Sequence, residues 1–376
     1  MPELLYSINT DRNNPWNSIP PLPIREELHD TIEILRKLGD AKAALGKLHG
    51  RSAVIPNQGL LINTISLQEA KVSSEIENIF TTDDELYREF SDNNNESNGA
   101  SKEVLRYREA LWSGFNYLKS TKRFDQQYFI RVFQEIKQTK DSIRPSFIQL
   151  TIKQGGAGPN AGQVVYTPPR NQEIIRDRLK NLIDFVNDDE KYPIDFLLKM
   201  AIAHFQFEAI HPFRDGNGRT GRIFNINYLT NKGLLDVPIL FLSRYILDYK
   251  NDYYAGLNGV SQRGDWKNWL LFMLRAIENT SYQTFNKIND IVTAKDSIIE
   301  HIKKEEPKLR NPEDLVGAIF TQPLTKVKHL TDQKIYAENT ARDYLNKLCD
   351  LQVLEKKEMR GHHYYLNLEL YRILAE

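Results

Sequence analysis

The sequence predicts a mostly helical protein of 376 residues, with one small β-hairpin in its middle and a winged helix-turn-helix at its C-terminal end. Apolar residues recur at helical spacing through most of the chain. A Gly/Pro/Asn-rich stretch between β-forming residues near position 160 indicates the hairpin. Three short helical patterns followed by two strand-like runs indicate the winged helix. The expected fold class is therefore all-α with two small β additions.

Residues 1–100 are expected to form an N-terminal helical segment. The stretch Pro15 to Pro23 is proline-rich and irregular, and Glu26 to Leu48 then shows the apolar spacing of a long amphipathic helix. A second helical pattern covers about Ser66 to Phe80. The run from Ser91 to Lys102 is rich in asparagine and is typical of a mobile loop.

Residues 101–304 are expected to form the main helical core. The Gln149 to Pro169 stretch interrupts the helical pattern with β-formers around glycine, proline and asparagine, which predicts the hairpin. The expected helices of this core are Glu103 to about Gln138, Ile174 to Val186, Phe196 to Ile210 and Asp265 to about Lys304.

Residues 305–376 are expected to form a separate domain after a charged, proline-containing linker, KKEEPKLRNPE. Its order of helix, helix, helix and hairpin is that of a winged helix-turn-helix, with a recognition helix at about Ala337 to Leu351. Acidic residues dilute the positive charge of this segment, so protein docking is favoured over DNA binding. The residues available for DNA contact are Asn339, Arg342, Lys347, Lys356, Lys357 and Arg360.

The composition excludes several classes of protein. Fifty basic residues balance fifty acidic ones, so no global field attracts the chain to nucleic acid or to an anionic membrane. The single cysteine, Cys349, allows no internal disulfide and no cysteine-based zinc site, which fits a cytoplasmic location. Neither a signal peptide nor an apolar run long enough to span a membrane is apparent.

The most informative stretch lies between two helical patterns and reads HPFRDGNGRTGR, from His211 to Arg222. Gly216 and Gly218 leave main-chain N–H groups accessible where the chain enters the second helix. Because the N-terminal end of a helix is electropositive, this turn predicts a phosphate-binding cradle.

Charged side chains complete a reactive site within the same twelve residues. Arg219 and Arg222 share a helix face and can bind phosphate oxygens. The Asp215 carboxylate suits a Mg²⁺ ion that bridges phosphates. His211 has a pKa range suited to accepting a proton from an incoming hydroxyl.

This stretch resembles the Fic family motif, His-x-Phe-x-Asp/Glu-Gly-Asn-Gly-Arg-x-x-Arg, at every specified position. The resemblance implies a Fic-type helical core that binds ATP and Mg²⁺, with His211 as the general base. It implies that Asp215 holds Mg²⁺ and that the run up to Arg222 binds ATP. The other members of that run are Gly216, Asn217, Gly218, Arg219, Thr220 and Gly221.

Two further stretches are similar to parts of Fic proteins. The segment from Pro21 to the sequence SLQEAKVSSEIENI resembles the N-terminal region often joined to Fic cores. The hairpin sequence TIKQGG…VVYTPP resembles the flap that docks target proteins by main-chain pairing. The flap residues expected to contact a target are Ile152, Gln154, Gly155 and Tyr166.

The sequence SSEIEN, from Ser73 to Asn78, fits the inhibitory pattern of the family, Ser/Thr-x-x-x-Glu-Gly/Asn. The resemblance implies that Glu77 pairs with Arg222 and keeps that arginine from the γ-phosphate of ATP. Ser73 is the other specified residue of this pattern. Some relatives with such a glutamate also catalyse the reverse reaction, the removal of AMP from a modified protein.

Tyr253 and Tyr254 occupy a position where the family often places aromatic contacts to adenine, although a helical aromatic pair is also typical of a core. One of the two is therefore a candidate ATP contact.

The function expected from the resemblance is transfer of AMP from Mg-ATP to a Ser, Thr or Tyr hydroxyl of a target protein or of the chain itself. Two alternatives remain open. The first is an ATP-sensing transcription regulator that binds DNA through the winged helix, and the second is a Fic-type kinase or other phosphotransferase. A homodimer is compatible with the resemblance, and no membrane partner is expected.

Overall fold

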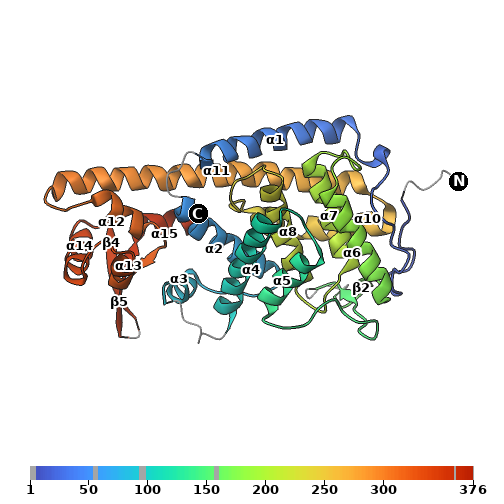
Figure 1. Ribbon diagram of the computed structural model, residues 1–376, viewed down its shortest axis with the longest axis horizontal. Helices are drawn as coiled ribbons and strands as arrows, with labels where there is room; N and C mark the ends of the chain where they lie inside the picture. Colours follow the sequence, from blue (N-terminus) through green and yellow to red (C-terminus); the bar gives the residue numbers. More distant parts are fainter. Residues whose placement is uncertain (1–5, 54–57, 93–98, 156–160, 360, 376) are drawn as a thin grey trace.

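The computed structural model describes residues 6–53, 58–92, 99–155, 161–359 and 361–375. It is an elongated, mostly helical molecule (Figure 1), as the sequence predicts. The helices of the larger part are η1 Glu26–Leu28, α1 Ile32–Ala53, α2 Gln58–Ile76, α3 Asp83–Asp92, α4 Ala100–Thr121, α5 Gln126–Lys137, α6 Gln172–Asn187, α7 Phe196–Ile210, α8 Asn217–Asn231, α9 Leu242–Asp248, α10 Lys250–Arg263 and α11 Trp266–Glu305.

Helix α11 is 40 residues long and extends along the molecule in Figure 1, with α1 lying beside it. The α1 helix presents an apolar stripe at a spacing of three or four residues, which includes Ile34, Leu38 and Leu45. Burial of this stripe against α11 fixes the N-terminal helix on the core.

Helices α7 and α8 form the centre of the core and pack against each other. Nearly every residue of α7 is buried, which explains why its sequence is apolar all round rather than along one stripe. Asp195 caps the start of this helix, because its side chain accepts a hydrogen bond from the Leu197 N–H at 2.9 Å. Because α7 and α8 are enclosed by other helices, the short segment between them has a rigid support.

The predicted hairpin is present as β1 Ile152–Lys153 and β2 Val164–Tyr166, which pair antiparallel with Ile152 opposite Tyr166. Its turn over 156–160 lies outside the described residues. The run from Ser91 to Lys102 was expected to be a mobile loop, but Ser91 and Asp92 end α3 and Ala100 begins α4. Positions 93–98 of that run also lie outside the described residues.

The C-terminal segment contains the predicted three helices and hairpin, and it adds a short strand and a last helix that the sequence pattern did not reveal. The additional strand β3 pairs with β5, so that the sheet order is β3-β5-β4. The elements are α12 Pro312–Ile319, β3 Leu324–Thr325, α13 Val327–Asp332, α14 Glu338–Asp350, β4 Leu354–Met359, β5 His362–Asn367 and α15 Leu368–Ala375.

The C-terminal elements contact the larger part of the molecule through α11 and α3. Asp92 at the end of α3 forms an ion pair with Lys326 and accepts a hydrogen bond from the Tyr364 hydroxyl at 2.7 Å. The His329 imidazole lies 3.0 Å from the Ser91 carbonyl oxygen. Within the described part of the chain, none of the helices combines the length and the apolar character needed to cross a lipid bilayer.

Candidate active site

His211 lies at the C-terminal end of α7, where the chain leaves the helix in a left-handed conformation with φ 49° and ψ 61°. Its main-chain N–H donates to the Phe207 carbonyl at 3.0 Å and so completes the last helical turn. A non-glycine residue in this region of φ and ψ carries a conformational cost that the surroundings must offset.

The imidazole of His211 has one nitrogen committed to the protein. Nδ1 lies 3.2 Å from the Glu208 carbonyl oxygen, which can only accept a hydrogen bond. In the neutral ring, Nδ1 therefore carries the proton and Nε2 carries the free lone pair. Burial lowers the pKa of His211 to about 4, so the neutral, proton-accepting form predominates near pH 7.

The loop after His211 is held by internal packing and hydrogen bonds. Phe213 is fully buried and its ring stacks on that of Phe133 with 4.2 Å between centroids. The side chain of Asn217 accepts from the Phe213 N–H and donates to the Phe213 carbonyl, both at 2.9 Å. Gly216 adopts a φ of 76°, which favours glycine, and α8 begins directly after it. The expected phosphate contact of Asn217 can therefore come only from its main chain while these bonds persist.

Asp215 is the exposed acidic residue of the loop, with 65% of its side chain accessible. One carboxylate oxygen lies 2.7 Å from Lys137 Nζ, and the other accepts the Gly216 N–H at 2.6 Å. Partial burial raises the pKa of Asp215, but the contact with Lys137 outweighs this effect and lowers it below the usual value. The group is thus ionised and available to a cation near pH 7.

Arg222 points from α8 toward the end of α2 and is almost fully buried. Its Nε donates to the Ser73 hydroxyl at 2.8 Å, and its terminal nitrogen donates to the Ser73 carbonyl at 3.0 Å and to Glu77 Oε1 at 2.8 Å. Burial raises the pKa of Glu77, but the charge of Arg222 outweighs this effect and holds it below its usual value. The two residues are thus an ionised pair.

Arg219, the other arginine of the motif, also has a carboxylate partner. Its NH1 lies 3.0 Å from an oxygen of Glu103, at the start of α4. The side chain of Arg219 is 3% exposed, and its Nε has no hydrogen-bond partner among the described residues. Each motif arginine is therefore oriented by one acid from the N-terminal half of the chain.

The remaining motif residues face the interior of the protein. Thr220 is fully buried and its hydroxyl donates to the Gly216 carbonyl at 2.9 Å. A Cβ on Gly221 would lie 2.4 Å from Glu208 Oε1, so this glycine permits close packing of α8 on α7. Thr220 and Gly221 therefore pack within the protein in this structure, and their part in ATP binding stays a prediction. A Cβ on Gly218 would lie 2.6 Å from Glu77 Oε1, so Gly218 leaves room for the acid.

The two tyrosines have different environments. Tyr253 is 2% exposed and its hydroxyl lies 3.0 Å from the Nε2 of the buried His204. Tyr253 is therefore packed in the core in this structure, and its contact with ATP stays a prediction. Tyr254 is 39% exposed and its ring lies edge-on to that of Tyr253. Tyr254 is thus the exposed member of the pair, and its contact with a nucleotide stays a prediction.

The four expected flap contacts also divide into two groups. Gln154 and Gly155 are exposed, and Ile152 is half-buried against the core. Tyr166 is 7% exposed and donates its hydroxyl proton to the Ala209 carbonyl at 2.7 Å. Tyr166 thus anchors the flap to α7, and its contact with a target stays a prediction.

Arg144 and Glu103 lie near the site but were not identified from the sequence, and Glu208 was considered there only as a disfavoured metal ligand together with His204 and His211. Arg144 is 2% exposed and donates its Nε to the His211 carbonyl at 2.8 Å. Burial raises the pKa of Glu208, one turn before His211, to about 8. The local sequence Ile143-Arg144-Pro145 shows only a charged residue directly before a proline, which is a weak signal for a functional residue. Burial, which the sequence does not show, is what would have strengthened that signal.

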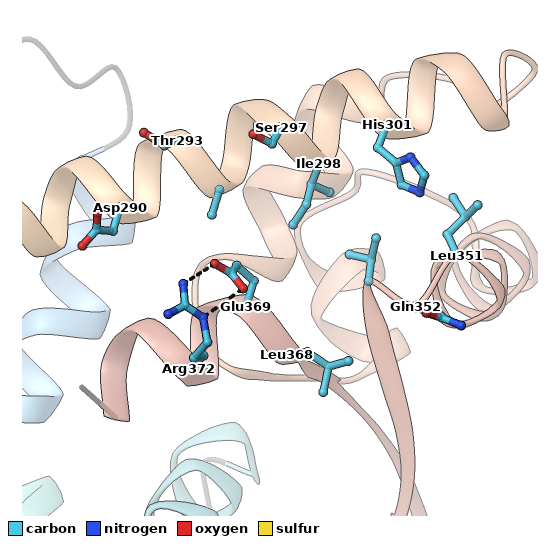
Figure 2. A pocket seen from close by; sticks show the side chains of 12 residues that line it. Asp290, Thr293, Ser297, Ile298, His301, Leu351, Gln352, Leu368, Glu369 and Arg372 are labelled. Carbon is cyan, nitrogen blue, oxygen red and sulfur yellow. Dashed lines mark hydrogen bonds and ion pairs between the residues drawn. The ribbon is translucent and has the colours of Figure 1, made fainter.

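A separate hollow of the surface lies away from this site. A cavity of about 590 Å³ lies between α11 and the C-terminal elements, where Figure 2 shows Glu369 and Arg372 paired with each other. None of the motif residues His211 to Arg222 lines it. Among the described residues, no group of three His, Cys, Asp or Glu side chains is arranged to hold a metal ion by protein ligands alone.

Comparison with known families matches most of the chain to three consecutive family models. The Fic/DOC family N-terminal model matches residues 35–116, and the Fic/DOC family model matches residues 124–229. The C-terminal domain model of SoFic-like protein adenylyltransferases matches residues 295–370. The second match contains the whole motif and the flap.

Curated relatives share the central region. Protein adenylyltransferase fic-1 of Caenorhabditis elegans is 30% identical over 131 residues, which is 35% of this chain and 24% of the relative. Protein adenylyltransferase Fic of Nematostella vectensis is 37% identical over 89 residues, which is 24% of this chain and 18% of the relative. The matched region thus spans about a quarter or less of these relatives.

Solved structures show the same fold. A Fic family protein from Desulfovibrio desulfuricans G20 has a TM-score of 0.52 and 20% identity, over 92% of this chain and 98% of that one. The Fic-1 structure from C. elegans has a TM-score of 0.51 and 19% identity, over 68% and 72% of the two chains. Together with the motif and the three family matches, these findings show that the chain belongs to the Fic family.

Proposed function

We propose that the protein is an adenylyltransferase that moves AMP from ATP to a Ser, Thr or Tyr hydroxyl of a target protein or of itself. The observation that carries this proposal is the neutral His211 directly before a rigid loop that leads into an arginine-bearing helix N-terminus. The names of the relatives, protein adenylyltransferases, support the same reaction.

The proposed reaction is an in-line displacement at the α-phosphorus. His211 Nε2 accepts the proton of the target hydroxyl, and the hydroxyl oxygen forms a bond to that phosphorus. The bond between the α-phosphorus and the bridging oxygen of the β-phosphate breaks, and pyrophosphate leaves. Main-chain N–H groups at the start of α8, with Arg219 and Arg222, hold the negative charge of the phosphates in position.

The residues present fit a Mg²⁺ ion held together with nucleotide phosphates. Asp215 offers one ionised and exposed carboxylate, and Mg²⁺ at phosphate sites commonly takes one or two carboxylates with phosphate oxygens and waters. When bound, the ion would neutralise the phosphates. Lys137 would then release the carboxylate oxygen that it now contacts.

We also propose that the Glu77–Arg222 pair is an inhibitory contact. While Arg222 is bound to Glu77 and Ser73, its donors toward α2 are not available to a γ-phosphate. ATP would then bind with its α-phosphate displaced from the line of attack. Release of Glu77 would free Arg222, so the segment that carries Ser73 and Glu77 would regulate transfer.

The DNA-binding alternative receives less support. On α14, Arg342 pairs with Glu338 at 2.7 Å and Lys347 pairs with Glu306 at 3.0 Å. Both cations would exchange these partners for DNA phosphates, which reduces the gain from binding. No contact of the described residues favours a kinase. The domain limits at residues 100 and 304, a homodimer and a cytoplasmic location remain predictions.

The test compares His211→Ala with its parent in a chain that also carries Glu77→Gly. We expect AMP transfer to fall by at least about 10²-fold, because a general base contributes on the order of 10²–10⁴-fold. ATP affinity, measured by calorimetry, should stay within a few-fold, since the phosphate contacts lie on α8. Equal losses of binding and transfer would contradict the role of His211, and unchanged transfer would reject it.

A further inference from the structure

The C-terminal end of α7 has an unusual set of hydrogen-bond donors over it. The last carbonyls of a helix have no partner within the helix and need donors from elsewhere. Here four consecutive carbonyls, those of Ala209, Ile210, His211 and Pro212, each accept a hydrogen bond from a segment outside α7. Every donor belongs to one of two residues. Arg144 precedes the hairpin, and Tyr166 is the last residue of its second strand.

Arg144 supplies three of these four bonds. Its Nε donates to the His211 carbonyl at 2.8 Å, its NH2 to the Ile210 carbonyl at 3.5 Å, and its main-chain N–H to the Pro212 carbonyl at 2.9 Å. The same guanidinium also donates to the Pro169 carbonyl at the far stem of the hairpin. A buried cation that binds main-chain carbonyls at a helix C-terminus is favoured by the local dipole.

Tyr166 supplies the fourth bond from the other side of the hairpin. It is the last residue of β2 and lies opposite Ile152 of β1, and its hydroxyl donates to the Ala209 carbonyl at 2.7 Å. The ring is buried and lies edge-on to that of Trp16. The stem of the hairpin is thus attached to the helix that ends in His211.

We propose that Arg144 and Tyr166 form a clasp that holds His211 in its left-handed conformation and links the position of the hairpin to the position of this base. The inference deepens the proposed function and rests on it for its catalytic consequence. Both are positioning residues, because they act through the His211 main chain. A target strand that pairs with the hairpin edge would then be positioned relative to His211 Nε2, because the clasp holds both the hairpin and His211.

The clasp predicts a specific kinetic pattern. The phosphate cradle belongs to α8, whereas the hydrogen bonds of the clasp go to α7, to the two residues after it and to the stem of the hairpin. Loss of the clasp should therefore reduce kcat and leave the KM for ATP nearly unchanged. A purely structural role would reduce the fraction of folded enzyme or disturb both parameters.

The experiment uses the 376-residue chain with Glu77→Gly as the parent. We expect Arg144→Gln to lower kcat at least about tenfold and Tyr166→Phe to lower it about threefold, in line with the loss of charged and neutral hydrogen bonds. Arg144→Lys should recover part of the activity. The double variant should lose less than the product of the single effects, because the two residues share one support. The matched control is Arg170→Gln, which removes an exposed guanidinium bound to the Ser146 carbonyl without contact to α7.

Hydrogen exchange measured by mass spectrometry tests the clasp without a measurement of enzyme activity. In Tyr166→Phe, we expect faster exchange both in 161–169 of the hairpin and in 209–216 of the catalytic loop, with no change in α14. Acceleration confined to the hairpin, or an ATP KM that rises as kcat falls, would overturn the clasp. If the parent transfers no AMP at all, the proposed function fails, and the exchange pattern alone still decides the clasp.

Discussion

Replacement of Glu77 breaks the contact with Arg222 that we propose as inhibitory. The expected gain in AMP transfer can be worked out from the exposure and distance of this pair. Arg222 is 2% and Glu77 35% exposed at the side chain, and 2.8 Å separates their bonded atoms. A hydrogen bond between charged groups contributes about 1.5–3 kcal/mol. Since Glu77 is one-third exposed, solvent screening places this contact near the lower end, about 1.5–2 kcal/mol.

At about 1.4 kcal/mol for each factor of ten, this energy corresponds to roughly 10–30-fold in the productive binding of ATP. Glu77→Gly should therefore raise AMP transfer by about that factor when ATP is below saturation. Glu77→Gln loses the charge but keeps an acceptor for Arg222, so its gain should be smaller, about threefold. Glu75→Gln is the matched control, because Glu75 lies 4.0 Å from Lys71 and outside the pair.

The assay is initial-rate transfer from ATP labelled at the α-phosphate, at several ATP concentrations, for the four proteins. The reasoning is refuted if Glu77→Gly is no faster than the unaltered chain, or if Glu75→Gln gives an equal rise.

Three further predictions concern other parts of the protein. Burial raises the pKa of Glu69 to about 7. The folded state therefore binds more protons than the unfolded state between about pH 4.5 and 7. Because of this difference, the contribution of Glu69 to the free energy of unfolding falls as the pH rises through this window. Urea unfolding across this range should show a weaker pH dependence in Glu69→Gln than in the unaltered chain, and an unchanged slope would contradict the assignment. Phe213→Ala should lower the free energy of unfolding by about 3–5 kcal/mol, because a fully buried ring that stacks on Phe133 is removed; a loss below 1 kcal/mol in urea melts would show that the loop does not depend on it. Asp215→Asn should raise the Mg²⁺ concentration for half-maximal transfer at least about tenfold, and an unaltered Mg²⁺ titration would remove this residue from the proposed ion site.

The sequence was sufficient to predict most helices, because their local patterns match their tertiary environments. Phe196 to Ile210 was predicted with the bounds that α7 has, since a continuous apolar run begins after a capping Asp195. The first long helix was placed correctly but was expected to start earlier, at Glu26, where the structure has η1 and then a break before α1. Such boundaries depend on packing that a single sequence does not show.

The last helix and the short strand β3 were missed for a related reason. The two residues of β3 have no periodic pattern of their own, and they become a strand only because β5 lies beside them. Helix α15 follows β5 without a turn signal in the sequence, and its apolar face is explained by contact with α11.

Within the site, the sequence indicated which residues can take part in the reaction. It did not indicate which of them are bound to other residues of the protein. The pairing of Arg222 with Glu77 joins positions 145 residues apart, and it was expected only from the family resemblance. The Arg219 contact with Glu103 and the Arg144 contact with the His211 carbonyl also join distant segments, and no local pattern marks either. Burial likewise distinguishes packing residues from ligand contacts, and it is a property of the fold.

The most direct test of the central claim is a comparison of ATP labelled at the α-phosphate with ATP labelled at the γ-phosphate. Protein carrying Glu77→Gly is incubated with Mg²⁺ and each nucleotide, and protein-bound label and intact mass are then measured. The proposed function predicts label from the α-phosphate only, with a mass gain of one AMP. Label from the γ-phosphate alone would make the protein a kinase, and the absence of both labels, with a known Fic target supplied, would contradict adenylyl transfer.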